Sequence, residues 1–183
     1  MWSIDHIVES EMRRLHLEKK GIRGLAISES FSQDSKKSIL SGIVMSTDLI
    51  IDGFVMGHST VGGNDVTDTI LEMHKRLDRS DVSFILTSGI VISLHNKIDL
   101  KRISEETGLP VIGVTYEASD YDLGTGPREM ITLHTSHNLY IRNEGCTILE
   151  AKQLLDKITL QGSIPEPLRI SQLLANTLLK AKF

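Results

Sequence analysis

The chain has 183 residues, of which 40% are hydrophobic and 24% charged, and its formal net charge is −4. This length suits one domain with a single sizeable core, and the composition excludes an intrinsically disordered chain. Only 4% of the residues are aromatic, so the core must be aliphatic and few side chains can stack on bases. The acidic balance disfavours a broadly basic nucleic-acid surface.

Two small basic clusters stand out against this acidic background. Lys19, Lys20 and Arg23 form one, and Lys36 and Lys37 form the other. Such clusters can contact phosphates locally. Solvated surface charge is the plainer interpretation of both.

Cysteine usage and hydropathy indicate the compartment. Cys146 is the only cysteine, so neither a disulfide within the chain nor a cysteine-based zinc site can form. This usage fits a reducing compartment, and we expect a cytoplasmic protein. The opening MWSIDHIVESEMRR has acids where a signal peptide needs an apolar core, and no apolar run is long enough to span a membrane.

The first third of the chain predicts one helix and three strands. Apolar residues recur at helical spacing over residues 3–18. Strands are then expected at 22–28, 38–46 and 49–57, joined by a polar loop and a short turn. Because the connections are short, these strands should form an antiparallel meander.

The rest of the chain alternates helices and strands before becoming less regular. A helix should follow Asn64 or Asp65 and run to about Leu77. A strand, a helix and a second buried strand come next, an order that predicts a right-handed parallel unit. The expected elements are strand 82–87, helix 99–106, strand 109–116, a short helix at 127–133, strand 139–142, and helices 147–159 and 165–180.

This order of elements is that of an α/β, ribonuclease H-like architecture. It predicts a mixed sheet, with three antiparallel strands followed by parallel strands, flanked by helices. We expect one domain over residues 1–183.

Four stretches carry a more specific resemblance. They are GLAISESF at the first strand end, GGNDVTDTI at the first core helix, LTSGIVISLHNKIDL after the fourth strand and GSIPEPLRISQLLANTL near the C-terminus, and TGLPVIGV adds the fifth strand. On these the chain resembles an archaeal family of uncharacterised proteins with endonuclease V-like domains (domain of unknown function ninety-nine), over about residues 21–183. The resemblance implies a site in which, as in endonuclease V, carboxylates at the first strand end, near the first core helix and at the fourth strand end bind a divalent metal.

The chain departs from this family at the acidic positions. The Asp-Asp pair expected at the first strand end corresponds to Ser28 and Glu29, and the aspartate of the fourth strand corresponds to Ser88. Mg²⁺ and Mn²⁺ need hard oxygen ligands, usually including one or two carboxylates. A neutral hydroxyl is a weak substitute, so two serines on neighbouring strand ends predict a site that no longer cleaves. The family's assisting lysine is also missing after Val114.

The remaining acids leave a residual Mg²⁺ or Mn²⁺ site open. Asp65 is either a ligand or the N-cap of the first core helix, and the cap is the favoured interpretation. Asp99 is likewise a candidate cap. If Ser28 faces the former site, Glu29 faces away, because successive strand side chains point to opposite faces.

His95 and Asn96 correspond to a Phe-Asn-x-x-Asp segment of the family. They should lie in a loop at the mouth of the cleft, where they could contact a base edge or a phosphate. The plainer interpretation is an ordinary surface loop.

Three functional hypotheses follow. The first is a catalytically degenerate endonuclease V-like protein that binds DNA or RNA through the former active-site cleft. The second is a weak divalent-metal-dependent endonuclease using Glu29, Asp65 and Asp99. The third is a non-enzymatic scaffold whose partner is another protein, and no membrane partner is expected.

Overall fold

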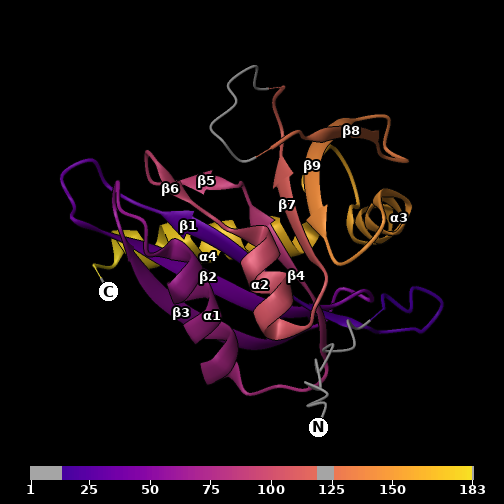
Figure 1. Cartoon of the computed structure of the whole chain (residues 1–183), viewed down its shortest axis with the longest axis horizontal. Coiled ribbons are helices and arrows are strands. Elements are labelled where there is room, and N and C mark those ends of the chain that lie inside the picture. The colour runs from indigo at the N-terminus through magenta and orange to yellow at the C-terminus, as the bar shows by residue number, and fades with distance from the viewer. Residues whose placement is uncertain (1–13, 119–125, 183) are drawn as a thin grey trace, which may run out of the picture.

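A seven-stranded mixed sheet forms the middle layer of the molecule (Figure 1). The computed structural model describes residues 14–118 and 126–182. The strand order is β3-β2-β1-β4-β7-β9-β8, and β5 and β6 form a separate hairpin. The strands are β1 (Arg23–Ser30), β2 (Lys37–Ser46), β3 (Ile51–Thr60), β4 (Val82–Ser88), β5 (Val91–Ile92), β6 (Asn96–Lys97), β7 (Val111–Thr115), β8 (Glu129–Thr132) and β9 (Asn138–Glu144).

Pairing within the sheet follows the predicted order. β1, β2 and β3 form an antiparallel meander, and β1, β4 and β7 are parallel neighbours. β9 pairs antiparallel with both β7 and β8. The β1–β4 contact requires a glycine at position 24, because an added Cβ there would lie 2.0 Å from the ring of Phe84.

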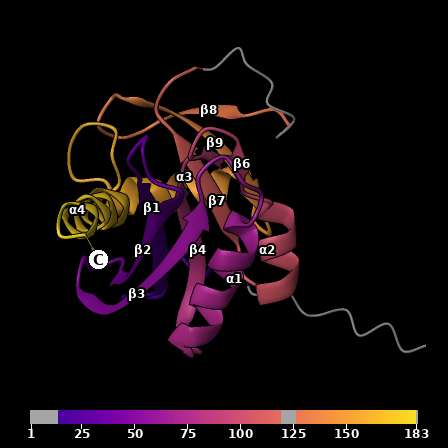
Figure 2. The same ribbon diagram turned by 90° about the vertical axis from the view of Figure 1, so that its left-hand side faces the viewer.

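Helices cover both faces of the sheet, as Figure 2 shows with α4 on one side and α1 and α2 on the other. Side chains of β1 alternate between two cores. Leu25 and Ile27 pack in the core under α1 and α2, whereas Ala26 packs in the core under α3 and α4. The helices are α1 (Val66–Leu77), α2 (Leu100–Thr107), α3 (Ile148–Ile158) and α4 (Glu166–Lys180). No helix in the described residues combines the length and the apolar character needed to cross a membrane.

The edge strand β3 is protected by arginines. Arg79 Nη1 donates to the carbonyl of Asp52 at 3.1 Å, and Arg76 at the end of α1 donates to the carbonyl of Met56. These bonds occupy backbone acceptors along an edge that could otherwise pair with another chain.

Two predicted helices are wrong where the structure can be compared. The segment expected to be a short helix at 127–133 contains strand β8, paired with β9. Ile131 and Leu133 are buried while Thr132 is exposed, and this period of two fits a strand. Residues 14–18 are not helical, and the rest of the helix expected at 3–18 lies outside the described residues.

Candidate functional site

The parallel strands β1 and β4 end side by side, because Ile27 pairs with Thr87. Ser28, Glu29 and Ser88 follow directly and border one small cavity. The cavity measures about 10 Å³, which is space for about one water molecule. Its other walls are aliphatic: Ile27, Leu40, Ile70, Ile92 and Ile98.

Ser28 belongs to a buried hydroxyl network beneath α4. Its side chain is 2% exposed. Its Oγ shares a hydrogen bond with Ser171 Oγ and lies 3.3 Å from the carbonyl oxygen of Leu168. Ser41 of β2 donates to the carbonyl of Ser171. The hydroxyl of Ser28 therefore joins the sheet to α4.

Glu29 turns to the opposite face of the sheet and holds the β5–β6 hairpin. Its carboxylate accepts from the backbone N–H of Ser93 at 2.9 Å and from the Ser93 hydroxyl. Ser93 and Leu94 have φ angles of +34° and +75°, a left-handed conformation that non-glycine residues seldom adopt. The carboxylate thus stabilises a turn with an unfavourable backbone conformation. The side chains of Ser28 and Glu29 lie on opposite faces of the sheet, as the alternation of side chains along a strand requires.

Asp65 stands at the N-cap position of α1, but its side chain makes no capping bond. The carboxylate instead accepts from the backbone N–H and the hydroxyl of Thr60 at 2.9 and 2.8 Å, and from Asn96 Nδ2 at 3.0 Å. Burial opposes the charge, but these hydrogen bonds outweigh it and lower the pKa of Asp65 to about 2. Lys37 Nζ lies 3.8 Å away. The carboxylate is therefore charged, bonded and already next to a cation.

Asn96 supplies the bond that Asp65 was expected to make. Its Oδ1 accepts from the backbone N–H of Val66 at 3.2 Å, and its Nδ2 donates to Thr60 O and to Asp65. The residue has no exposed surface. The expectation that Asn96 contacts nucleic acid is therefore corrected, because a helix start and a carboxylate use its amide. His95 beside it is exposed.

Asp99 caps α2 as predicted, since its Oδ1 accepts from the backbone N–H of Arg102 at 3.0 Å. A cap of this kind satisfies one of the free amides of the first helical turn.

Ser88 is partnered by Tyr116, which the sequence did not single out. Burial raises the pKa of Tyr116 to about 12, and a hydrogen bond with the side chain of Ser88 opposes part of that rise. The phenol is therefore neutral near pH 7.

These residues do not fit a Mg²⁺ or Mn²⁺ ion. Ser28 and Ser88 are neutral, and Asp65 does not line the cavity that Glu29 borders. Within residues 14–118 and 126–182, no three His, Cys, Asp or Glu side chains are grouped closely enough to hold a metal ion. Carboxylates that meet at one point are what a hard cation requires.

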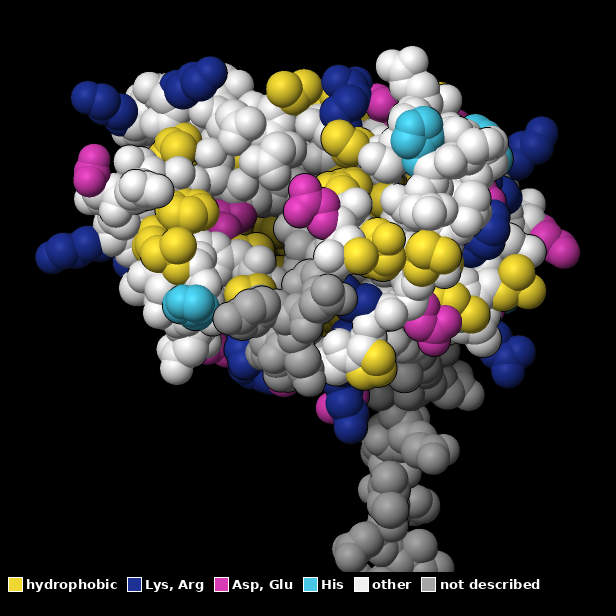
Figure 3. Space-filling model, turned by 90° about the horizontal axis from the view of Figure 1, so that it is seen from above, with side chains coloured by type: hydrophobic (Ala, Val, Ile, Leu, Met, Phe, Trp, Pro, Cys, Tyr) yellow, Lys and Arg dark blue, Asp and Glu magenta, His cyan; other side chains and the backbone are white. Residues whose placement is uncertain are grey.

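The end of the molecule that carries this site has a mixed apolar and acidic surface near its middle. Figure 3 views it from above: hydrophobic side chains and Asp or Glu side chains lie near the middle of this face, and most Lys and Arg side chains of the described residues lie toward the rim.

Residues 20–179 match the family model described as Endonuclease dU. The chain belongs to the endonuclease dU family. A relative, the UPF0215 protein of Methanopyrus kandleri, is 30% identical over 191 residues, which cover 92% of this chain and 97% of that protein.

Solved structures similar to this family member share its fold. A protein of unknown function from Archaeoglobus fulgidus has a TM-score of 0.73 and 26% identity, and the match covers 85% of this chain and 97% of that one. Ciona intestinalis endonuclease V, in complex with a 24mer DNA containing an inosine, has a TM-score of 0.67 and 11% identity, with 91% and 89% covered. The fold is therefore endonuclease V-like and ribonuclease H-like, as the sequence resemblance implied.

Proposed function

We propose that this chain is a member of the endonuclease dU family that has lost metal-dependent cleavage and binds nucleic acid on the former active-site face. The observation that carries the loss of cleavage is the state of Ser28 and Ser88. Both stand where the family resemblance places carboxylates, both side chains are neutral, and the hydroxyl of Ser28 bonds within the protein. Without converging carboxylates, no metal is held to activate water or to clamp phosphate oxygens.

The surviving acids support the same proposal because they have structural partners. On one side of the hairpin turn, Glu29 accepts a hydrogen bond from Ser93. On the other side, Asp65 accepts a hydrogen bond from Asn96. The backbone N–H of Gly62 donates to Ser93 O at 2.7 Å between them. Two carboxylates that fix a hairpin are not free to share a metal ion.

Nucleic-acid binding rests on the exposed tip and flank of the β5–β6 hairpin. Leu94 is 61% exposed, and His95 and Lys97 are exposed beside it. An exposed leucine with a histidine and a lysine on the same hairpin offers contacts to an unstacked base and to its phosphate. Ciona endonuclease V, which has the same fold, binds an inosine-containing DNA.

Fluorescence anisotropy with labelled single-stranded DNA and RNA tests the proposal. The oligonucleotides would carry deoxyuridine, deoxyinosine or inosine, or no altered base, and each titration would be run at low salt in EDTA and in Mn²⁺. We expect equal affinity in both buffers, intact strands on a denaturing gel, and weaker binding by His95→Ala and Lys97→Ala. Lys180→Ala on α4 removes a charge elsewhere and is the matched control.

The two other hypotheses appear as distinct outcomes of this experiment. Cleavage that requires Mn²⁺ and disappears in Asp65→Asn would establish the weak endonuclease instead. Absence of binding in either buffer, together with a stable protein partner, would favour the scaffold.

A further inference from the structure

A second concave region lies at the opposite end of the sheet, where β1 and β4 begin. It has a volume of about 500 Å³ and is formed by residues 14, 16 and 19–23 together with residues 80, 81 and 83. Among the described residues, its lining includes Arg14, His16, Lys19, Lys20 and Arg23, and one acid, Asp81.

That acid is already neutralised. Arg79 binds Asp81 with two hydrogen bonds, Nε–Oδ1 at 2.9 Å and Nη2–Oδ2 at 2.6 Å, which hold the pKa of Asp81 below its usual value. Arg23 and Arg79 also bind Asp52 at 2.6 and 2.7 Å. Two arginines and two aspartates thus balance one another beside the pocket.

Three cationic side chains of the pocket have no ionic partner among the described residues. Arg14, Lys19 and Lys20 are exposed, and none of them forms an ion pair with another described residue. The whole chain carries a net charge of −4, so this local excess runs against the average of the protein. Unbalanced like charges around one concavity attract an anion, particularly at low ionic strength.

The turn that carries the lysines is anchored at both ends. Leu15 before it and Ile22 after it are buried in the core under α3 and α4. The backbone N–H of Lys19 donates to His16 O at 3.0 Å, and Gly21 adopts a φ of +67°, where a side chain would be strained. The lysines therefore project from a fixed backbone.

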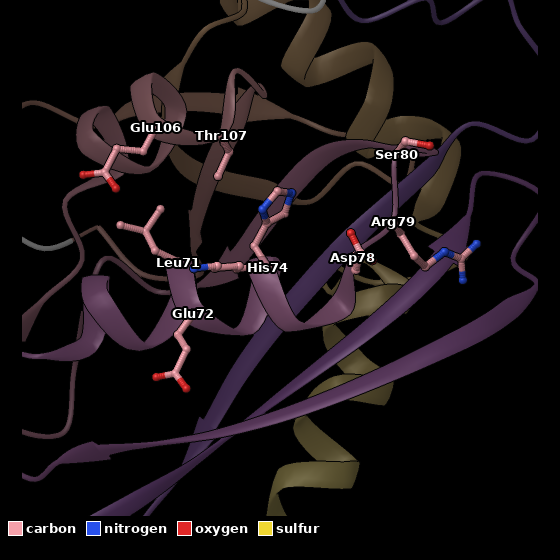
Figure 4. A pocket seen from close by; sticks show the side chains of 9 residues that line it. Leu71, Glu72, His74, Asp78, Arg79, Ser80, Glu106 and Thr107 are labelled. Carbon is pink, nitrogen blue, oxygen red and sulfur yellow. The ribbon is translucent and has the colours of Figure 1, made fainter.

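A larger concavity, of about 700 Å³, lies between the C-terminal parts of α1 and α2 but shows no such bias. Figure 4 shows acids and a base together around it, and His74 pointing toward Thr107. Glu72, Asp78 and Glu106 line it against Lys75 and Arg79. Mixed signs favour no class of charged ligand.

We propose that the basic pocket binds the phosphate of a nucleotide, either free or at the 5′ end of a nucleic-acid strand. Lysine and arginine are the usual donors to phosphate oxygens, and three cations without an ion pair among the described residues suit a group that carries about two negative charges. The volume falls in the range of ~300–1,000 Å³ that is typical of small-molecule sites. The pocket lies at the opposite end of the sheet from the hairpin, so each site can be altered without the other.

Isothermal titration calorimetry on the full chain at low salt tests this site. The probes are pyrophosphate, AMP and a short oligonucleotide with either a 5′-phosphate or a 5′-hydroxyl. We expect the double variant Lys19→Ala, Lys20→Ala to bind its phosphate probe at least about tenfold more weakly than the parent. The double variant Lys180→Ala, Lys182→Ala removes the same charge elsewhere and should bind within about twofold of the parent.

The probes separate the two sources of phosphate. Binding of AMP and pyrophosphate identifies a free nucleotide, and binding of only the 5′-phosphorylated strand identifies a strand end. The proposal is overturned if no probe binds, if both strands bind equally while AMP and pyrophosphate do not, or if the Lys19, Lys20 variant binds as the parent does. Thermal melting of each variant checks that a loss of binding is not a loss of fold.

Discussion

The two ends of the sheet differ in how their polar side chains are satisfied. At the end that carries the β5–β6 hairpin, Ser28, Glu29 and Asp65 all bond to neighbouring residues. At the opposite end, Lys19 and Lys20 line an open concavity without an ionic partner in the described part of the chain. Polar side chains that lie close together do not by themselves indicate a binding site. A better indication is a set of polar side chains that have no hydrogen-bond or ionic partner within the described part of the protein.

The largest effect should come from Asp65→Ala. The change leaves donors of Thr60 and Asn96 without their acceptor, so we expect a loss of about 2–4 kcal/mol of unfolding free energy. Urea titration followed by circular dichroism measures it. Asp68→Ala, an exposed acid on the same helix, should cost less than about 1 kcal/mol, and an equal loss in both variants would contradict a special role for Asp65.

A second test restores the family's carboxylate at the first strand end. Ser28→Asp places a charge beneath α4 against the carbonyl of Leu168, where no cation lies, so we expect a cost of about 2–4 kcal/mol. Ser28→Ala is the control and should cost about 1 kcal/mol. If the Asp variant folds stably and Mn²⁺ raises its melting temperature, the end of β1 is more open to metal than proposed.

The unfolding free energy should fall over a defined range of acidic pH, because Asp65 becomes protonated there. The folded-state pKa of Asp65 is lowered from 3.8 to about 2, so its stabilisation is full above the unfolded value and is lost as pH falls from about 4 toward 2. Because the side chain is 35% exposed, solvent screening reduces the effect to about 1–2 kcal/mol. Denaturant titrations at pH 5 and pH 2.5 should show this loss, with a smaller dependence in Asp65→Asn. A parent and a variant with the same pH dependence would argue against the assignment.

The smallest effect on stability is expected at the basic end. Removing Lys19 and Lys20 breaks no ion pair, so the unfolding free energy should change by less than about 0.5 kcal/mol or rise slightly as repulsion falls. The same urea titration, run in low salt, measures this change. A loss as large as that of Asp65→Ala would mean that the lysines support the fold and that the two ends do not differ as described.

The sequence by itself determined the order of elements in most of the described chain. Period-two and helical patterns placed the three-stranded meander, the parallel unit and the last two helices, because burial on one face imposes those periods on the chain. The same reasoning brought Ser28 and Ser88 together, since parallel strands end at one edge of a sheet. The prediction was wrong at residues 129–132, which form a strand because they pair with β9.

Only the tertiary structure decided what the polar side chains do. Asn96 bonds to Val66 and Asp65, about thirty positions earlier in the chain, and Arg79 binds Asp52, 27 positions earlier. A local pattern cannot reveal such partners, because it reports which face a residue occupies and not which distant group meets it there. Whether a carboxylate is free to bind a metal, or a lysine free to bind a phosphate, depends on those long-range contacts.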